Sequence, residues 1–179
     1  HQVTLSLRLS EEFVMDRRGE DQTAFFNVPL SGTACGRISR ANPQPLAKSG
    51  DDLRIQWGSL YLAVPHGSVS FEQEKMAWLK GSIELNTENN TKGLFLLAYD
   101  DEEKALMYFH QPIPSFWTLN GNDICQILLR SLEQAEELLA ACHQFSQNLY
   151  AEAEKAGGAQ YAELCSLAYR QVIGAHKLA

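Results

Sequence analysis

The segment Val3-Thr-Leu-Ser-Leu-Arg-Leu9 alternates strictly between apolar and polar residues, and this pattern decides how the fold begins. Successive side chains of a β-strand point to opposite faces, so the apolar residues share one face and Thr4, Ser6 and Arg8 share the other. The segment is therefore predicted to be a strand with one face against a core and the other in solvent.

Six further segments have the composition of strands, and turn residues cluster between them, at 42–45, 86–90 and 112–114. The predicted strands are residues 24–28, 53–57, 60–64, 69–71, 83–85 and 94–99. Residues 53–64 read as two adjacent strands or one bent strand, because Gly58 divides two apolar runs. Short strands separated by turns at this spacing are typical of an antiparallel sandwich.

After Gly121 the apolar period changes from 2 to 3.6, which indicates helices. A long amphipathic helix, with or without a kink, is predicted from an N-cap at Asn122 or Asp123 to about Lys155. Gly157 and Gly158 permit a stop, and a second helix follows. The predicted fold is α+β: an antiparallel β-sandwich-like domain over 1–120, a linker helix over 121–156, and the first helix of a helical (α/α) domain over 157–179.

Both ends of the chain carry a regular pattern, since strand alternation starts within two residues of His1 and the helical pattern still runs at Leu178. We expect a segment of a longer protein, preceded by more β structure and followed by more helices. An open sheet edge and an uncovered apolar helix face would also favour a homodimer of this segment.

Composition excludes several classes of partner. With 15 basic residues against 22 acidic ones among 179, and a net charge of -7, a nucleic-acid-binding surface is not expected. The apolar runs are too short to span a membrane. The four cysteines, Cys35, Cys125, Cys142 and Cys165, form no C-x-x-C pair and are predicted to be small buried residues. The histidines lack metal-binding spacing, so neither a metal nor another cofactor is predicted.

No catalytic motif is present, because the sequence lacks a nucleophile elbow and a phosphate-binding loop. The acidic run 100–103 lacks the spacing of a calcium loop and is predicted to be a solvated turn. The aromatic residues Trp57, Trp78 and Trp117 are candidates for stacking on sugar rings, although aromatic residues of this kind more often fill cores. A carbohydrate-binding module therefore stays open as an alternative.

Two long motifs stand out, at residues 48–65 and 156–178, and they resemble segments of the glutaminase A family of large multidomain proteins. The first is Lys48-Ser-Gly-Asp-Asp-Leu-Arg-Ile-Gln-Trp-Gly-Ser-Leu-Tyr-Leu-Ala-Val-Pro65, which is similar to the family's G-D-D-L-R-I-D-W-G-Y-L-Y-L segment. The second is Ala156-Gly-Gly-Ala-Gln-Tyr-Ala-Glu-Leu-Cys-Ser-Leu-Ala-Tyr-Arg-Gln171, continuing to Ala175-His-Lys-Leu178. Residues 95–101 and 108–117 also fit, so the resemblance covers nearly the whole chain. The sequence departs from the family pattern at Gln56, Ser59 and Ser146.

The resemblance implies a periplasmic or extracellular protein that hydrolyses L-glutamine to glutamate and ammonia on a helical toroid domain. This segment would hold no catalytic residue and would brace that domain. Arg170, Gln171 and His176 are the candidate substrate contacts, because they are polar groups in the matched helix and Arg170 suits a carboxylate. The alternatives are a structural ion pair for Arg170 and a domain-interface position for His176. The same layout occurs in glycoside hydrolases, so an accessory segment of such an enzyme is the competing interpretation.

Overall fold

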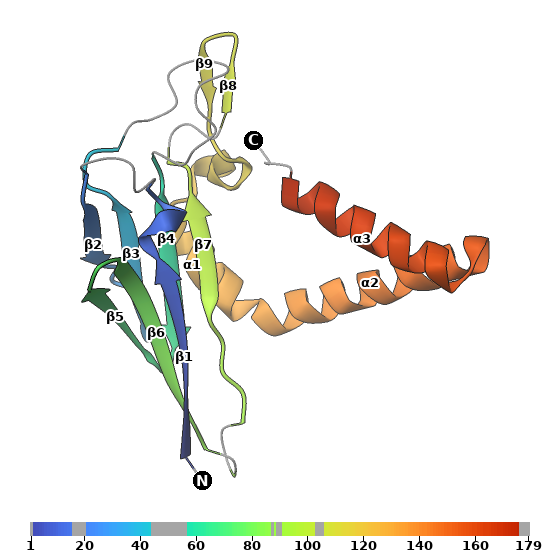
Figure 1. Ribbon diagram of the computed structural model, residues 1–179, viewed down its shortest axis with the longest axis horizontal. Coiled ribbons are helices and arrows are strands. Elements are labelled where there is room, and N and C mark those ends of the chain that lie inside the picture. Colours follow the sequence, from blue (N-terminus) through green and yellow to red (C-terminus); the bar gives the residue numbers. More distant parts are fainter. Residues whose placement is uncertain are drawn as a thin grey trace. The chain divides into compact units, whose positions relative to one another are not determined.

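The computed structural model describes residues 2–15, 21–43, 57–86, 88, 91–102 and 106–175. It confirms the predicted α+β class, with antiparallel sheets first and helices after them (Figure 1). The chain divides into two compact units, unit 1 over residues 1–128 and unit 2 over residues 129–178.

The first sheet, sheet A, has the strand order β1-β6-β5, and both pairings are antiparallel. Its strands are β1 (Gln2–Ser10), β6 (Ala77–Asn86) and β5 (Ser68–Gln73). Leu5 lies opposite Ile83 and Leu9 opposite Leu79, so apolar residues of neighbouring strands fall on one face. The strand predicted from the alternation at 3–9 is thus confirmed.

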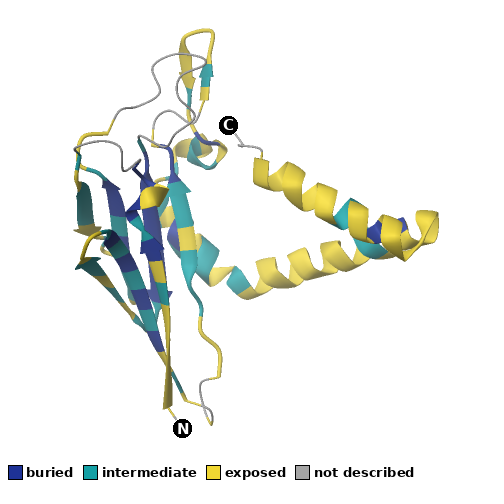
Figure 2. Ribbon diagram, in the orientation of Figure 1, coloured by how far each residue is buried: buried dark blue, intermediate teal, exposed yellow. Residues whose placement is uncertain are grey.

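The second sheet, sheet B, has the order β2-β3-β4-β7 and is also antiparallel. Its strands are β2 (Thr23–Asn27), β3 (Thr33–Arg40), β4 (Ser59–Pro65) and β7 (Leu96–Asp100). Buried residues of both sheets form one cluster, which includes Ile38 and Leu62 from sheet B and Leu79 from sheet A. Figure 2 shows these buried residues concentrated in the sheets. The two sheets therefore enclose a common core, as in a sandwich.

Two glycines allow the sheets to approach closely. A Cβ atom at Gly36 on β3 would lie 2.7 Å from Cγ1 of Val69 on β5, and one at Gly81 on β6 would lie 2.8 Å from Cγ2 of Val64 on β4. Both distances are shorter than van der Waals contact, so the core is shaped around the missing side chains.

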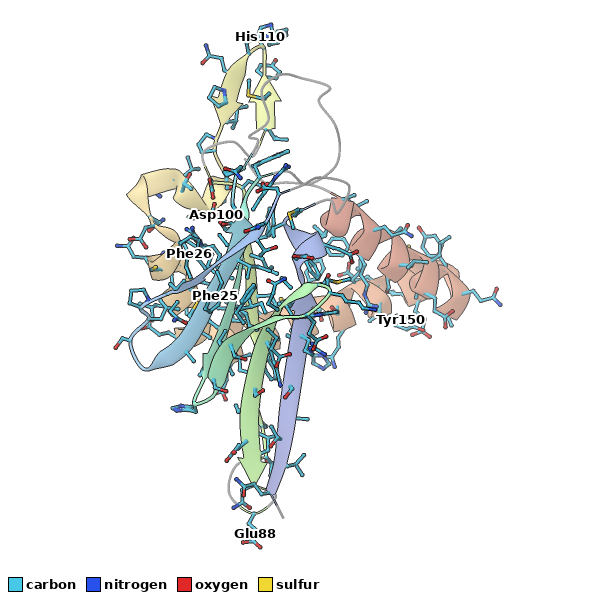
Figure 3. All side chains as sticks on the ribbon, turned by 60° about the vertical axis from the view of Figure 1, so that its left-hand side comes forward. Phe25, Phe26, Glu88, Asp100, His110 and Tyr150 are labelled. Atoms are coloured by element: carbon cyan, nitrogen blue, oxygen red, sulfur yellow. The ribbon has the colours of Figure 1, made fainter. Side chains whose placement is uncertain are left out.

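The two faces of β2 lie in different environments, as Phe25 and Phe26 show (Figure 3). The ring of Phe25 stacks on Phe71, with the centroids 5.2 Å apart, and joins the edge of the core. The neighbouring Phe26 points to the other face, where the Arg37 guanidinium lies 4.3 Å from its ring centroid.

Several predicted strands need correction or fall outside the described chain. β3 was not predicted, and the predicted strand 53–57 lies outside the described residues except for Trp57. The predicted turn at 112–114 is wrong in part, because Pro112 belongs to β9 (Gln111–Ile113), which pairs with β8 (Leu106–Tyr108).

The helices are α1 (Ile124–Glu133), α2 (Ala135–Gly157) and α3 (Ala159–Ala175), and short 3-10 helices η1 (Glu11–Phe13) and η2 (Phe116–Gly121) lie in unit 1. The predicted linker helix is interrupted at Gln134. Asp123 caps α1, since its Oδ1 accepts the backbone N–H of Gln126 at 2.8 Å and Gln126 Oε1 accepts that of Asp123 at 3.1 Å. Among the described helices, none has the length and apolar character needed to cross a membrane.

Candidate functional site

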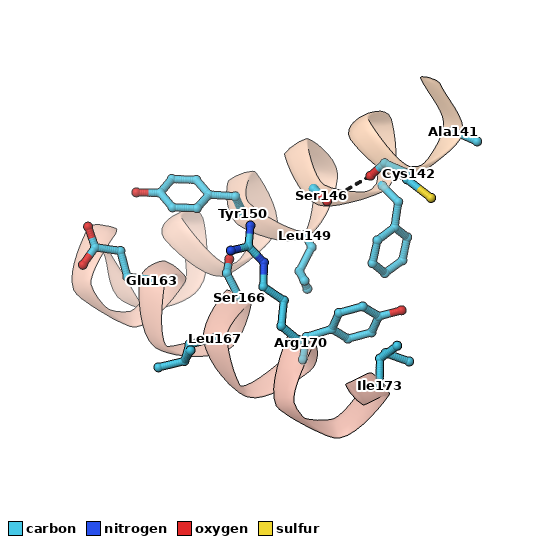
Figure 4. A pocket seen from close by; sticks show the side chains of 12 residues that line it. Ala141, Cys142, Ser146, Leu149, Tyr150, Glu163, Ser166, Leu167, Arg170 and Ile173 are labelled. Carbon is cyan, nitrogen blue, oxygen red and sulfur yellow. Dashed lines mark hydrogen bonds between the residues drawn. The ribbon is translucent and has the colours of Figure 1, made fainter. Parts of the chain in front are cut away.

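A groove of about 900 Å³ runs between α2 and α3 in unit 2 (Figure 4). Its walls carry aromatic and aliphatic side chains, among them Phe145 and Leu149 from α2 and Tyr169 and Ile173 from α3. A volume of this size and apolar walls are typical of sites for small ligands.

The shape of the groove follows from the sizes of the residues between the two helices. Near the turn, Ala153 and Ala162 are 8% and 0% exposed, so small side chains let the helices come close. Gly158, with φ of 83°, ends α2 and donates its N–H to the Glu154 carbonyl at 2.7 Å. Further along, the rings of Phe145 and Tyr169 meet with centroids 5.0 Å apart and bridge the helices. The groove opens where these larger residues replace the alanines.

Arg170 supplies the positive charge of the groove. Its side chain extends from α3 across the groove towards Tyr150 and Ser166 (Figure 4). Within the described part of the chain, no carboxylate forms an ion pair with it. A guanidinium in this position can donate two parallel hydrogen bonds to an incoming carboxylate.

The structure places the three predicted substrate contacts differently. Arg170 lines the groove, whereas the next residue, Gln171, is exposed and does not line it. Successive helical residues differ by about 100° in direction, which explains the difference. His176 lies outside the described residues.

Sequence reasoning missed Tyr150 and Glu163 as groove residues. Glu163 and Arg170 are seven residues apart, which is about two helical turns, so one face for both could have been predicted. The place of Tyr150 in the groove could not have been predicted, because it depends on how α2 packs on α3.

The three tryptophans proposed to stack on sugars lie in different places, and each is half-buried: Trp57 precedes β4, Trp78 lies on β6 and Trp117 lies in η2. The Arg8 guanidinium lies 4.7 Å from the ring centroid of Trp78 and occupies one face of that indole.

The solvated turn predicted at 100–103 is confirmed only for Glu102, which is exposed in a turn, and Glu103 lies outside the described residues. Asp100 and Asp101 are only 8% and 9% exposed, and Asp100 lies at the end of β7 (Figure 3). Burial raises the pKa of Asp100, although a hydrogen bond from the Glu102 backbone N–H at 2.7 Å acts in the opposite direction. Because Asp100 Oδ1 accepts a hydrogen bond from the backbone of Glu102, we interpret this carboxylate as structural.

A second, more polar groove of about 720 Å³ in unit 1 is lined by Glu11, Asp21 and Thr23 among others. Both carboxylates already have partners: Glu11 accepts the Thr23 hydroxyl at 2.7 Å, and Asp21 pairs with Arg40. The side chains of Asp21 and Arg40 are 6% and 9% exposed, so this is a buried ion pair. Among the described residues, no group of three or more acidic, histidine or cysteine side chains could hold a metal ion.

The cysteine prediction is only partly confirmed. Cys35 is buried, but Cys142 is exposed and Cys125 and Cys165 are half-buried. Burial, with a smaller effect of Cys125, raises the pKa of Cys35 to about 12, which makes this thiol unreactive in the folded protein.

No protein family, curated protein or solved structure matches this chain. The resemblance to glutaminase A therefore stays a prediction from the two sequence motifs.

Proposed function

We propose that this chain is the non-catalytic supporting part of a glutaminase-like amidohydrolase, an enzyme that converts L-glutamine to glutamate and ammonia. In this proposal the sandwich braces the catalytic domain, and the α2–α3 hairpin forms one wall of the substrate path. Within the described residues, the first motif ends with the buried strand β4, and the second spans the α2–α3 turn and α3.

The observation that carries the proposal is Arg170 above the apolar groove. The α-carboxylate of glutamine would accept hydrogen bonds from the guanidinium, while the methylene chain would lie against apolar walls such as Leu149 and Ile173. The groove suits the recognition of a small amino acid.

The groove is not equipped to cleave an amide by itself. Hydrolysis needs a nucleophile or an activated water together with a general base. Cys142 lines the groove, but the adjacent His143 ring nitrogen contacts Gln147 at 2.9 Å on the same helix. No nucleophile and base pair is formed by the groove residues of the described chain, so the catalytic groups would come from the following domain.

The test combines an activity assay with a binding assay. The purified chain should release no ammonia from L-glutamine, and turnover by the chain alone would refute the supporting role. Chemical-shift titration with L-glutamine should perturb α2 and α3, and Arg170→Ala should weaken binding about 10-fold to 100-fold, as expected for loss of a charged hydrogen-bond pair.

Two variants serve as controls for this titration. Arg130→Ala removes an exposed arginine of α1 that does not line the groove, and it should bind like the wild type. Arg170→Lys keeps the charge but loses the planar fork, so intermediate affinity is expected. Equal affinity of the wild type and Arg170→Ala for L-glutamine would show that Arg170 does not contact the substrate.

The competing hypothesis is an accessory segment of a glycoside hydrolase or a carbohydrate-binding module. It requires accessible aromatic faces, and Arg8 covers one face of Trp78. Tryptophan fluorescence during titration with oligosaccharides distinguishes the two hypotheses, because quenching that saturates would favour sugar binding.

A further inference from the structure

We propose that β1 is the pairing strand of a symmetric dimer. In this dimer β1 of one copy lies antiparallel to β1 of a second copy, and the two copies of sheet A become one six-stranded sheet. The proposal is independent of the glutaminase hypothesis, since it concerns unit 1 alone.

The first observation is that β1 is a long and exposed edge strand. In the described chain it pairs only with β6, over all nine residues from Gln2 to Ser10. Val3 and Leu5 are 47% and 44% exposed although they belong to its apolar face, and Figure 2 shows this half of the strand as exposed. An edge strand of this kind presents backbone N–H and C=O groups that a further strand can bind.

The second observation is that β1 lacks the devices that usually protect an edge. It contains no proline and no lysine, and the other edge strands of sheets A and B, β2, β5 and β7, have only five or six residues. Its one charged residue is Arg8, whose guanidinium lies over the ring of Trp78. The same guanidinium forms ion pairs with Glu72 at 3.0 Å and Glu74 at 3.2 Å. The middle of the strand is therefore uncharged and open.

The third observation identifies the occupant as a second copy. A two-fold axis at Ser6 places Leu5 opposite Leu7 of the second copy and Val3 opposite Leu9 of the second copy, so apolar residues meet apolar residues along the whole strand. Arg8 falls opposite Thr4 of the second copy, so no like charges meet. A slip by one residue would set apolar against polar side chains, and a slip by two would leave only seven of the nine residues paired, so the register centred on Ser6 gives the longest matched ladder.

This register uses the full length of the strand. In an antiparallel ladder every second residue points its N–H and C=O outward, so nine paired residues supply about eight to ten intermolecular hydrogen bonds. The contact is a single strand pair of limited area, and the dimer should be weak and dependent on concentration.

Sedimentation analysis over about 10 µM to 1 mM protein should show a monomer–dimer equilibrium, in the micromolar to millimolar range typical of small interfaces. Ser6→Lys should weaken the dimer at least about tenfold, because it brings two like charges together at the two-fold axis. The matched control is Ser68→Lys. Ser68 lies in the same row of sheet A, since Ser82 pairs with both Ser6 and Ser68, but on the opposite edge strand β5.

A cross-linking experiment gives the positive evidence. In the proposed dimer the two copies of residue 6 have Cβ atoms about 4.5 to 5.5 Å apart, close enough for a disulfide after a small adjustment. In a background with Cys142 and Cys165 replaced by serine, Ser6→Cys should give a disulfide-linked dimer under mild oxidation, and Ser68→Cys should not.

Three results would overturn the proposal: a monomer at every concentration, a dimer that Ser6→Lys leaves unchanged, or equal effects of Ser6→Lys and Ser68→Lys. The intrinsic fluorescence of each variant checks that the sandwich remains folded.

Discussion

Replacing Gly81 with alanine should destabilise the sandwich strongly for a change of one methyl group. The added Cβ would lie 2.8 Å from Cγ2 of Val64, 2.9 Å from Cδ2 of Leu62 and 3.3 Å from Cδ1 of Phe95. Val64 and Leu62 are both 0% exposed, so neither has solvent to move into. The strands β4 and β6 would have to separate by several tenths of an ångström.

The expected cost is about 2 kcal/mol, within the range for inserting a methyl group into a packed core. For a unit of this size, a loss of 1 kcal/mol lowers Tm by about 4 °C, so a decrease of roughly 8 °C is expected. The loss should appear as a lower denaturant midpoint with an unchanged slope, because the surface exposed on unfolding stays the same.

Tryptophan fluorescence measures this transition selectively, because all three tryptophans, Trp57, Trp78 and Trp117, lie in unit 1. Gly174→Ala is the matched control, since no atom lies within 4 Å of the added Cβ on α3. That variant should leave the fluorescence transition unchanged and raise helix stability by up to about 1 kcal/mol. An unchanged midpoint for Gly81→Ala would refute the close approach of the two sheets at this position.

Three further predictions concern charge, capping and thiol reactivity. Burial acts to raise the pKa of Asp21, but hydrogen bonds, first among them that from Arg40, outweigh it and lower the pKa to about 2. Unit 1 should therefore lose about 1 to 2 kcal/mol as pH falls from about 4 to about 2, and the difference between wild type and Asp21→Asn in acid denaturation measures this step. Asp123→Ala should cost about 1 kcal/mol by removing the cap of α1, Asp123→Ser should recover most of it, and equal thermal transitions by circular dichroism for all three proteins would contradict the capping argument. Ellman's reagent should modify the exposed Cys142 in the native protein, whereas Cys35 should react only after unfolding, and rapid native modification of Cys35 would contradict its burial.

The strands that the sequence predicted well are those with one covered face. β1 alternates because its apolar residues share one face, on which Leu7 and Leu9 join the core while Val3 and Leu5 stay largely exposed. β3 was missed because it is covered on both faces: Ile38 is buried in the core, and Cys35 and Ser39 are buried on the opposite side. With Gly36 in its middle, such a strand has neither alternation nor a continuous apolar run.

The helical hairpin could be predicted because its signals are local. The periodicity after Gly121 and the stop at Gly158 need no knowledge of distant residues. The acidic run was misjudged because the burial of Asp100 depends on its pairing with Ser59, forty-one residues earlier in the chain. Long-range burial of a charged residue leaves no trace in local composition.

Prediction of the candidate site was limited in the same way. Arg170 was selected for its chemistry, and it does line the groove. Tyr150 contributes from another helix, and only the packing of α2 on α3 brings it to Arg170. The type of contact could be inferred from residue identity, but the set of residues that share the groove could not.

The pairing of β1 with β6 has a consequence for how the chain folds. Gln2 lies opposite Asn86 and Ser10 opposite Trp78, so among the described residues β1 finds its partner in sheet A only 68 to 84 residues further along the chain. Pairings between such distant residues are slow to form, because a long loop must close before any contact stabilises it. Until β6 has been synthesised, β1 lacks this partner, and an unpaired strand with the apolar residues Val3, Leu5, Leu7 and Leu9 is prone to aggregate. The hairpin of α2 and α3, whose contacts are local, should by contrast form within microseconds once both helices have left the ribosome.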